Sequence, residues 1–166
     1  MTPTTVTVTD IIAGEAAVSW GTDGSEADLG STVDGVSIRE EVEWYDITID
    51  QSVGVVRKVL VSRKIFVTFA LAEASLDHLR LGMNLASSSL ANSSLTIEDT
   101  EEGEKSLVVE SIGEGQSARN AKFPKCIITG STEHAYKKND TTLVPYECEA
   151  VCDPANSDRF GYIYDA

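Results

Sequence analysis

The alternation of apolar and polar positions predicts two different elements in direct succession between residues 63 and 85. In the run 64–71 the apolar residues share one parity, as in a strand with one buried face: Ile65, Val67, Phe69 and Leu71. The spacing of apolar residues then changes to three and four, at Leu76, Leu79 and Met83. This second pattern predicts an amphipathic helix over 73–84, packed on the sheet that contains the preceding strand.

The rest of the chain predicts strands and loops and no second helix. Strand patterns fall at 15–20, 36–39, 44–50, 95–99, 106–111, 123–129, 142–152 and 159–164, and a Gly/Asp/Ser loop falls at 21–30. The strands at 95–99 and 106–111 flank the acidic turn 100–104, which predicts a β-hairpin. Residues 86–94 are rich in Ser, Ala and Asn and predict irregular structure.

These elements predict one domain, 1–166, of the mainly β class. We expect two packed antiparallel sheets, a β-sandwich or barrel-like arrangement, with one short flanking α-helix. Residues 1–12, which alternate Thr and Val in part, are expected to form an N-terminal arm that pairs with another element. Residues 158–166 are expected to contain a C-terminal strand.

Two neighbouring segments are the candidate functional surface. In 44–50, Asp46, Thr48 and Asp50 share one strand face, which predicts that this face lies in water or at a subunit boundary. Residues 51–62 are expected to form a hairpin loop around Gly54, with exposed apolar side chains at Val53, Val55, Val56, Val59 and Leu60. Leaving such side chains exposed forfeits about 1.5–3 kcal/mol each that burial would return, so this loop is expected to need a partner.

Composition indicates a folded chain without a nucleic-acid-binding face. Hydrophobic residues make up 42% and aromatic residues 7%, within the range of globular domains. The chain carries 13 Lys and Arg against 27 Asp and Glu, a formal net charge of −14. Binding to duplex nucleic acid needs clustered basic residues, and here they are scattered. The acidity favours solubility, or a surface that passes a polyanion without holding it.

The three cysteines are expected to be free thiols. The amino terminus lacks the basic and apolar regions of a signal peptide, and no apolar run approaches the about 18 residues of a membrane helix, so we expect synthesis in a cytoplasm. Free thiols are the default in that reducing compartment. If Cys148 and Cys152 share a strand, their Cα atoms lie about 13 Å apart. A disulfide requires less than about 7 Å.

No catalytic, cofactor or metal site is expected from the sequence. There is no nucleophile elbow, and His78 and His134 are expected on the surface. Cys126, His134, Cys148 and Cys152 are residue types that bind zinc, but their spacing fits no compact knuckle. Adjacent carboxylates such as Glu101 and Glu102 face opposite ways on a strand and do not form an acid–base pair. We therefore expect a structural subunit, not an enzyme.

The chain resembles the major tail tube proteins of long, non-contractile-tailed bacteriophages. The first block of likeness covers 45–51, 59–60 and 67–79, a strand, loop, strand and helix. The second block covers 122–130, 133–140, 144–150, 153–154 and 160–161. Residues 86–105 contain no stretch of sequence that resembles the family.

The resemblance implies a structural virion protein. Its subunits form rings, typically of six, whose inner sheets join around a lumen, and the rings stack into the tail tube that conducts the genome. On this account residues 51–62 contact the neighbouring ring, and Asp46 and Asp50 face the lumen. The implied partners are further copies of the chain, a tape-measure protein and other tail proteins, with DNA passing transiently and no membrane. The implied location is the virion tail, after assembly in the host cytoplasm.

Other readings stay open from the sequence. The chain could be a tube or ring subunit of a related injection machine: a type VI secretion tube, a tail terminator or a baseplate ring. A monomeric β-sandwich binding module would also be acidic, rich in strands and free of catalytic motifs. Self-association distinguishes an assembly subunit from a binding module.

Overall fold

The computed structural model describes residues 16–50, 53–112, 119–130, 132, 143–157 and 159–165. The strands in these ranges are β1 Ala16–Thr22, β2 Ser25–Thr48, β3 Val55–Leu71, β4 Leu90–Ala91, β5 Ser94–Leu95, β6 Lys105–Ser111, β7 Arg119–Ile128, β8 Val144–Ala150 and β9 Tyr162–Asp165. The helical elements are α1 Leu76–Gly82 and two 3-10 turns, η2 Ser87–Ser89 and η3 Pro154–Asn156. The mainly β class with a short α-helix is confirmed, and the predicted N-terminal arm lies outside the described residues.

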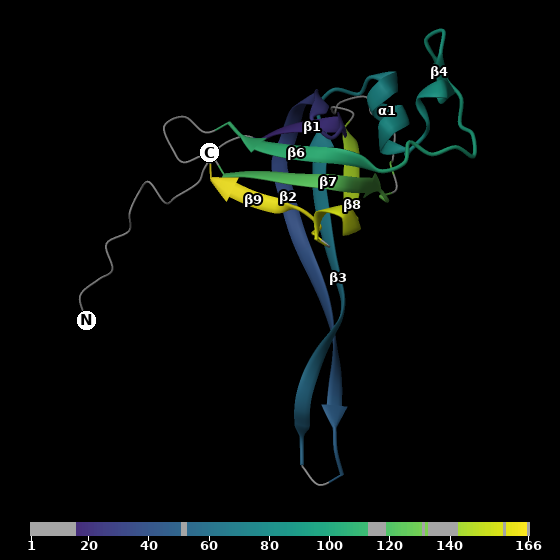
Figure 1. Cartoon of the computed structure of the whole chain (residues 1–166). Coiled ribbons are helices and arrows are strands. Elements are labelled where there is room, and N and C mark those ends of the chain that lie inside the picture. Colours follow the sequence, from purple (N-terminus) through teal and green to yellow (C-terminus); the bar gives the residue numbers. More distant parts are fainter. Residues whose placement is uncertain are drawn as a thin grey trace, which may run out of the picture.

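Seven of the strands form a single antiparallel sheet in the order β6-β1-β2-β3-β8-β7-β9. Because β6 also pairs with β7, the sheet closes on itself, as in a barrel. Figure 1 shows β6, β7 and β9 crossing β2 and β3, so the closed sheet has two layers. The predicted packing of antiparallel layers is therefore achieved by one sheet that folds over. β4 and β5 form a separate two-stranded ribbon.

The core lies between these two layers. The predicted parity of β3 is confirmed, because Val67, Phe69 and Leu71 are all buried. They join buried side chains of the other strands, including Val18, Leu107, Phe123, Val144 and Tyr146. The ring of Phe69 stacks on that of Tyr146 with 4.9 Å between centroids. The last strand, β9, falls within the predicted C-terminal segment and pairs with β7.

The helix is shorter than the predicted 73–84 and is anchored by a buried arginine. The Ser75 side chain caps α1 by accepting a hydrogen bond from the His78 backbone N–H. Arg80 donates to the carboxylates of Asp77 at 2.8 Å and Glu102 at 2.7 Å, and to the Leu85 carbonyl at 2.6 Å. The guanidinium therefore ties α1 to the chain that follows it.

The predicted hairpin of 95–99 with 106–111 is wrong. β5 pairs with β4, while β6 pairs with β1 and β7. Alternation marks a strand but does not identify its partner. Residues 96–104 instead run back past the helix, where the Glu102 N–H donates to the Asn84 carbonyl at 3.0 Å.

The predicted loop at 21–30 is also wrong. The chain turns tightly at Asp23 and Gly24, and β2 begins at Ser25. The strands predicted at 36–39 and 44–50 belong to this one strand of 24 residues. Polar residues within β2 interrupt the apolar pattern because much of the strand is exposed on at least one side.

The cysteines are divided between the core and a loop. Cys126 on β7 and Cys148 on β8 are buried, and burial raises the pKa of the Cys126 thiol to about 12. Cys152 follows the end of β8, so it does not share a strand with Cys148 as assumed above. No disulfide joins any of the three. In the described part of the chain, no helix is long and apolar enough to cross a membrane.

Replacing Arg80 with alanine should destabilise the fold, because in a largely buried site it leaves the Leu85 carbonyl without the guanidinium and Glu102 with only the longer contact to Lys105, at 4.0 Å. We expect a loss of about 3 kcal/mol in the free energy of unfolding, measured by urea denaturation. Arg119→Ala is the matched control, since the Arg119–Asp165 pair is exposed on both sides and should contribute little. Equal effects of the two substitutions would contradict the anchoring role of Arg80.

Candidate functional site

The pairing of β2 with β3 continues well beyond the body of the molecule. β3 pairs with β8 only from Ile65 to Leu71, whereas it pairs with β2 from Val55 onward. Figure 1 shows the remainder projecting as a long two-stranded ribbon. We call residues 41–50 and 53–64 the arm. A two-stranded ribbon without a third strand or a covering layer is marginally stable in water.

The local sequence of the arm suits a β-ribbon. It is rich in β-branched and aromatic residues, which favour extended structure. Across the two strands, Lys58 pairs with Asp46 at 2.7 Å and Ser62 donates to Glu43 at 3.3 Å. These contacts are exposed, so each contributes at most about 1 kcal/mol. They support the register of the arm, but they do not replace a hydrophobic core.

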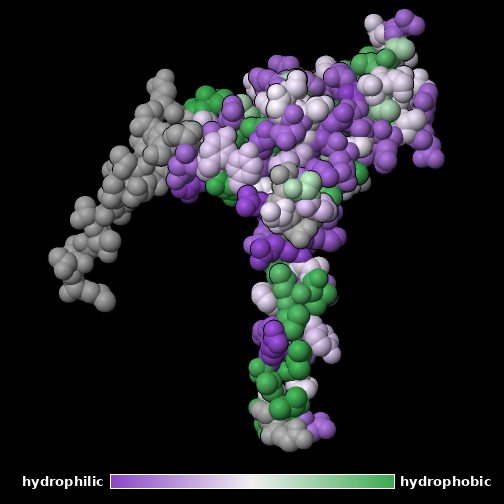
Figure 2. Space-filling view, viewed as in Figure 1, coloured by the Kyte–Doolittle hydropathy of each residue, from purple (hydrophilic) through white to green (hydrophobic). Residues whose placement is uncertain are grey.

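The arm exposes an unusual concentration of large apolar side chains. Trp44 is 53% exposed, Tyr45 64% and Leu60 43%. The other exposed apolar residues of the arm are Ile49, Val53, Val55, Val56, Val59 and Val61. In Figure 2 the arm is largely green, whereas the visible face of the body is mostly purple and white. A contiguous apolar surface of this kind marks an interaction site.

The register shows that both faces of the arm carry large apolar side chains among charged ones. Directly opposed residues of an antiparallel pair share a face. Val67, which is fully buried, opposes Ile38, so their side defines the inner face of the β2–β3 sheet. Along the arm this inner face carries the pair Trp44 and Leu60. The outer face carries other pairs of the arm, including Tyr45 with Val59 and Ile47 with Arg57.

Two β-bulges add to the apolar surface. The register shifts after Glu43 and after Ile47, which leaves Val61 and Val56 as extra residues on β3. In a bulge two residues oppose one, so the added valines lie beside Leu60 and Val55. The arm therefore presents more apolar side chains than a regular ribbon of its length.

The predicted hairpin tip around Gly54 is present, because the chain turns there between β2 and β3, but the predicted extent of the loop to residue 62 is wrong. Val55, Val56, Val59 and Leu60 lie in β3, and Val53 lies in the connection at the tip. The sequence suggested a loop because apolar residues occupy both parities, which hides the strand period when a ribbon is apolar on both faces. These five residues are exposed, and their contact with a neighbouring copy stays a prediction.

The predicted acidic face is less uniform than its sequence suggested. Asp46 lies on the inner face between Trp44 and the tip, and its charge is paired with Lys58. Asp50 lies beyond the end of β2, in the connection at the tip. The role of Asp46 and Asp50 at a lumen stays a prediction.

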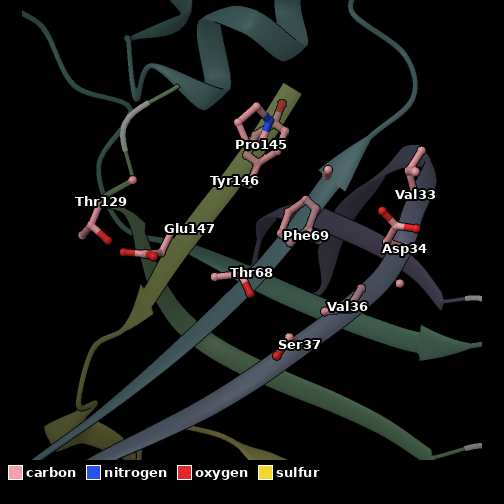
Figure 3. Close-up of a pocket in the computed structure, with 13 residues that line it drawn as sticks. Val33, Asp34, Val36, Ser37, Thr68, Phe69, Thr129, Pro145, Tyr146 and Glu147 are labelled. Carbon is pink, nitrogen blue, oxygen red and sulfur yellow. The ribbon is translucent and has the colours of Figure 1, made fainter. Parts of the chain in front are cut away.

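A second surface lies at the opposite end of the same sheet. It is a groove of about 620 Å³ on β2, β3 and β8, which we call the sheet groove. Its lining residues are Val33, Asp34, Gly35, Val36, Ser37, Thr68, Phe69, Ala70, Thr129, Gly130, Pro145, Tyr146 and Glu147, most of them drawn with labels in Figure 3.

A break in the β2–β3 ladder shapes one wall of the groove. The pairing jumps from Val33–Ala70 to Val36–Phe69, and between them Asp34 and Gly35 adopt positive φ values of 62° and 77°. Only Gly and a few short polar residues accept this conformation readily. Thr68 lies at the centre of the floor, paired with Ser37 on one side and Glu147 on the other. Because Val67 is on the inner face, these three side chains lie on the outer face.

The described residues hold no group of three or more His, Cys, Asp or Glu side chains placed to bind a metal ion. His78 lies on α1, where its ring contacts the Glu73 carbonyl, and His134 lies outside the described residues.

The fold of the chain as a whole is similar to that of several solved components of injection particles. No protein-family model matches the chain, and no curated protein matches it in sequence. A chain of the PVC sheath/tube terminator of an extracellular contractile injection system matches with a TM-score of 0.55 and 12% identity, over 99% of both chains. The tube terminating cap of the anti-feeding prophage matches with a TM-score of 0.51 and 14% identity, over 100% of this chain and 99% of that one.

A third match is the PVC sheath–tube complex, with a TM-score of 0.50 and 13% identity over 98% of this chain and 100% of that one. At these identities the likeness shows the fold alone. Two of these three structures are named as parts of a contractile injection system, so the likeness in fold is not specific to the non-contractile tail tube.

The two tryptophans provide a direct test of arm exposure. Trp20 is 6% exposed in the core and Trp44 is 53% exposed on the arm. In dilute solution, acrylamide should quench the emission of Trp44 strongly and that of Trp20 weakly, which gives a two-component quenching curve. The variant Trp44→Phe should retain only the weakly quenched component. A single protected component in the unmodified protein would show that the arm is covered within its own chain.

Proposed function

We propose that the chain is a structural, non-enzymatic subunit that assembles with copies of itself into rings that stack to form the tube of a tail or tail-like injection machine. The observation that carries this proposal is the arm, which exposes large apolar side chains on both faces and extends beyond any covering element of the described chain. The fold likeness to tube-associated proteins over nearly the whole chain supports it.

The energetic argument rests on burial of the arm. Each large apolar side chain that moves from water into an interface contributes about 1.5–3 kcal/mol. The arm exposes several large apolar side chains on each of its two faces. Burying all of them therefore requires that other molecules contact both faces of the arm. Insertion of the arm between neighbouring subunits provides such a cover, whereas a monomeric binding module would leave the arm open to aggregation.

Open strand edges support association within a ring. On the side of β2 away from β3, strand pairing with β1 ends at Ser31 and the Thr32 hydroxyl still donates to the Ala16 carbonyl, so the edge from Val33 to Thr48 pairs with no strand among the described residues. Long open edges favour pairing with another chain. Such pairing would join the sheets of adjacent copies around a lumen. Rings of six, a tape-measure protein within the tube and the passage of DNA are the finer features of this proposal, and they rest on the family resemblance.

A terminating ring or cap is the second candidate. It is favoured by two of the matching structures, which are a sheath/tube terminator and a tube terminating cap. A tube subunit binds further copies at both ends of the ring, whereas a terminator stops growth at one end. The length of the assembly formed by the purified chain therefore distinguishes the two.

The experiment is electron microscopy and sedimentation of the purified protein over a range of concentrations. We expect rings or stacked tubes with a lumen for the unmodified chain. The double variant Trp44→Ser and Leu60→Ser removes a facing pair from the inner face of the arm. It should keep the melting temperature of the subunit and lose assembly, because the arm adds little to the body core.

Ile97→Ser is the matched control for this variant, since Ile97 is 76% exposed but lies outside the arm. The control should assemble as the unmodified chain does. Monomer at every concentration, also in the presence of other tail proteins, would contradict the proposed function. Unchanged assembly of the double variant would contradict the role of the arm.

A further inference from the structure

We infer that the sheet groove is the receptor for the arm of the next copy along the stack. This inference rests on the proposed function and adds the surface to which the arm binds. The occupant is a second copy of this chain, specifically the inner face of its arm, with Trp44, Val56 and Leu60.

The positions of the two surfaces favour this contact. The arm and the groove lie at opposite ends of the same pair of strands, β2 and β3. Val56 in the arm and Thr68 in the groove are twelve residues apart on β3, which corresponds to about 40 Å along an extended strand. A copy moved by this distance along the strands would bring its arm to the level of the groove of its neighbour.

The faces of the sheet are also compatible. The apolar pair Trp44 and Leu60 lies on the inner face, and the groove floor at Thr68 lies on the outer face. Contact between the inner face of one arm and the outer face of the next sheet requires a displacement of about one layer, about 10 Å, together with a rotation that allows for the twist of the ribbon between the body and the tip. Because the two surfaces differ and lie at opposite ends, the contact is head-to-tail, and its repetition produces an open filament.

The side chains of the two surfaces are complementary in size. The floor and walls of the groove contain small residues, among them Gly35, Ala70 and Gly130. The arm supplies large ones, among them Trp44 and Leu60. Large aromatic and aliphatic anchors that fill a depression lined by small residues are typical of the energetically dominant part of an interface.

Charge at the rim favours the arm over a nucleic acid. Asp34 and Glu147 are carboxylates of the groove, and neither takes part in an ion pair with the described residues. Lys58 lies on the inner face of the arm, and its ammonium group has three donors, of which the contact with Asp46 uses one. It can therefore also donate to a rim carboxylate of the next copy. The same carboxylates repel phosphate.

Cross-linking between two single variants tests this contact. Val56→Cys places a thiol on the arm, and Ser37→Cys places one at the exposed edge of the groove, beside Thr68. The two proteins are mixed, assembled and treated with a short bismaleimide. We expect a covalent dimer in the mixture and only background in either protein alone. The unmodified protein, in which Cys126 and Cys148 are buried and Cys152 is partly exposed, supplies that background, and all variants are made with Cys152→Ser as well.

Ser88→Cys replaces Ser37→Cys in the control mixture, because Ser88 is exposed and is not one of the residues that line the groove. Assembly with a dimer only in the arm–groove mixture supports the inference. Assembly without that dimer, or with an equal yield in the control mixture, overturns the inference and leaves the proposed function standing. A failure of all proteins to assemble, the unmodified chain included, overturns both.

Discussion

The backbone pairing of β2 with β3 runs without a change of partner from Thr32 and Leu71 in the body to Thr48 and Val55 near the tip. In the body the pair is flanked by β8 and covered on its inner face by the other layer, so its apolar residues are buried. In the arm the same ladder continues, and none of the described residues forms a flanking strand or a second layer there. The arm therefore derives its order from the body and exposes a surface that no described residue covers.

This division separates folding from assembly. The core cluster consists of residues outside the arm, so the stability of the subunit should depend little on the arm. The arm in turn carries most of the large exposed apolar residues. A subunit of this kind can be synthesised and folded alone and still gain a large apolar contact on association. Because the sheet groove lies at the other end of the same strands, the inferred contact between arm and groove would join successive copies head-to-tail.

The sequence predicted those features that depend on local periodicity. The parity of β3 over Ile65–Leu71 and the presence of a helix after Ala74 both follow from apolar spacing, and both are observed. The partner of β5, the unbroken length of β2 and the strand character of Val55–Leu60 were missed. These features depend on pairing between strands, on the bulges at Val56 and Val61, and on the exposure of both faces of the arm. The alternation of apolar and polar residues along one segment does not contain this information. The sheet groove was missed as well, and the only local signal for it was the Asp34-Gly35 pair.

Hydrogen exchange of the arm amides, measured by mass spectrometry on the free subunit and on the assembled protein, tests the central claim most directly. The account predicts fast exchange in 42–48 and 55–61 of the free subunit, where a two-stranded ribbon has no cover, and slow exchange in β3 at 65–71. On assembly the arm should become as protected as the body, while the body changes little. Arm amides that are already protected in the monomer, or that remain unprotected in the assembled tube, would contradict the claim that the arm is the element that joins the copies.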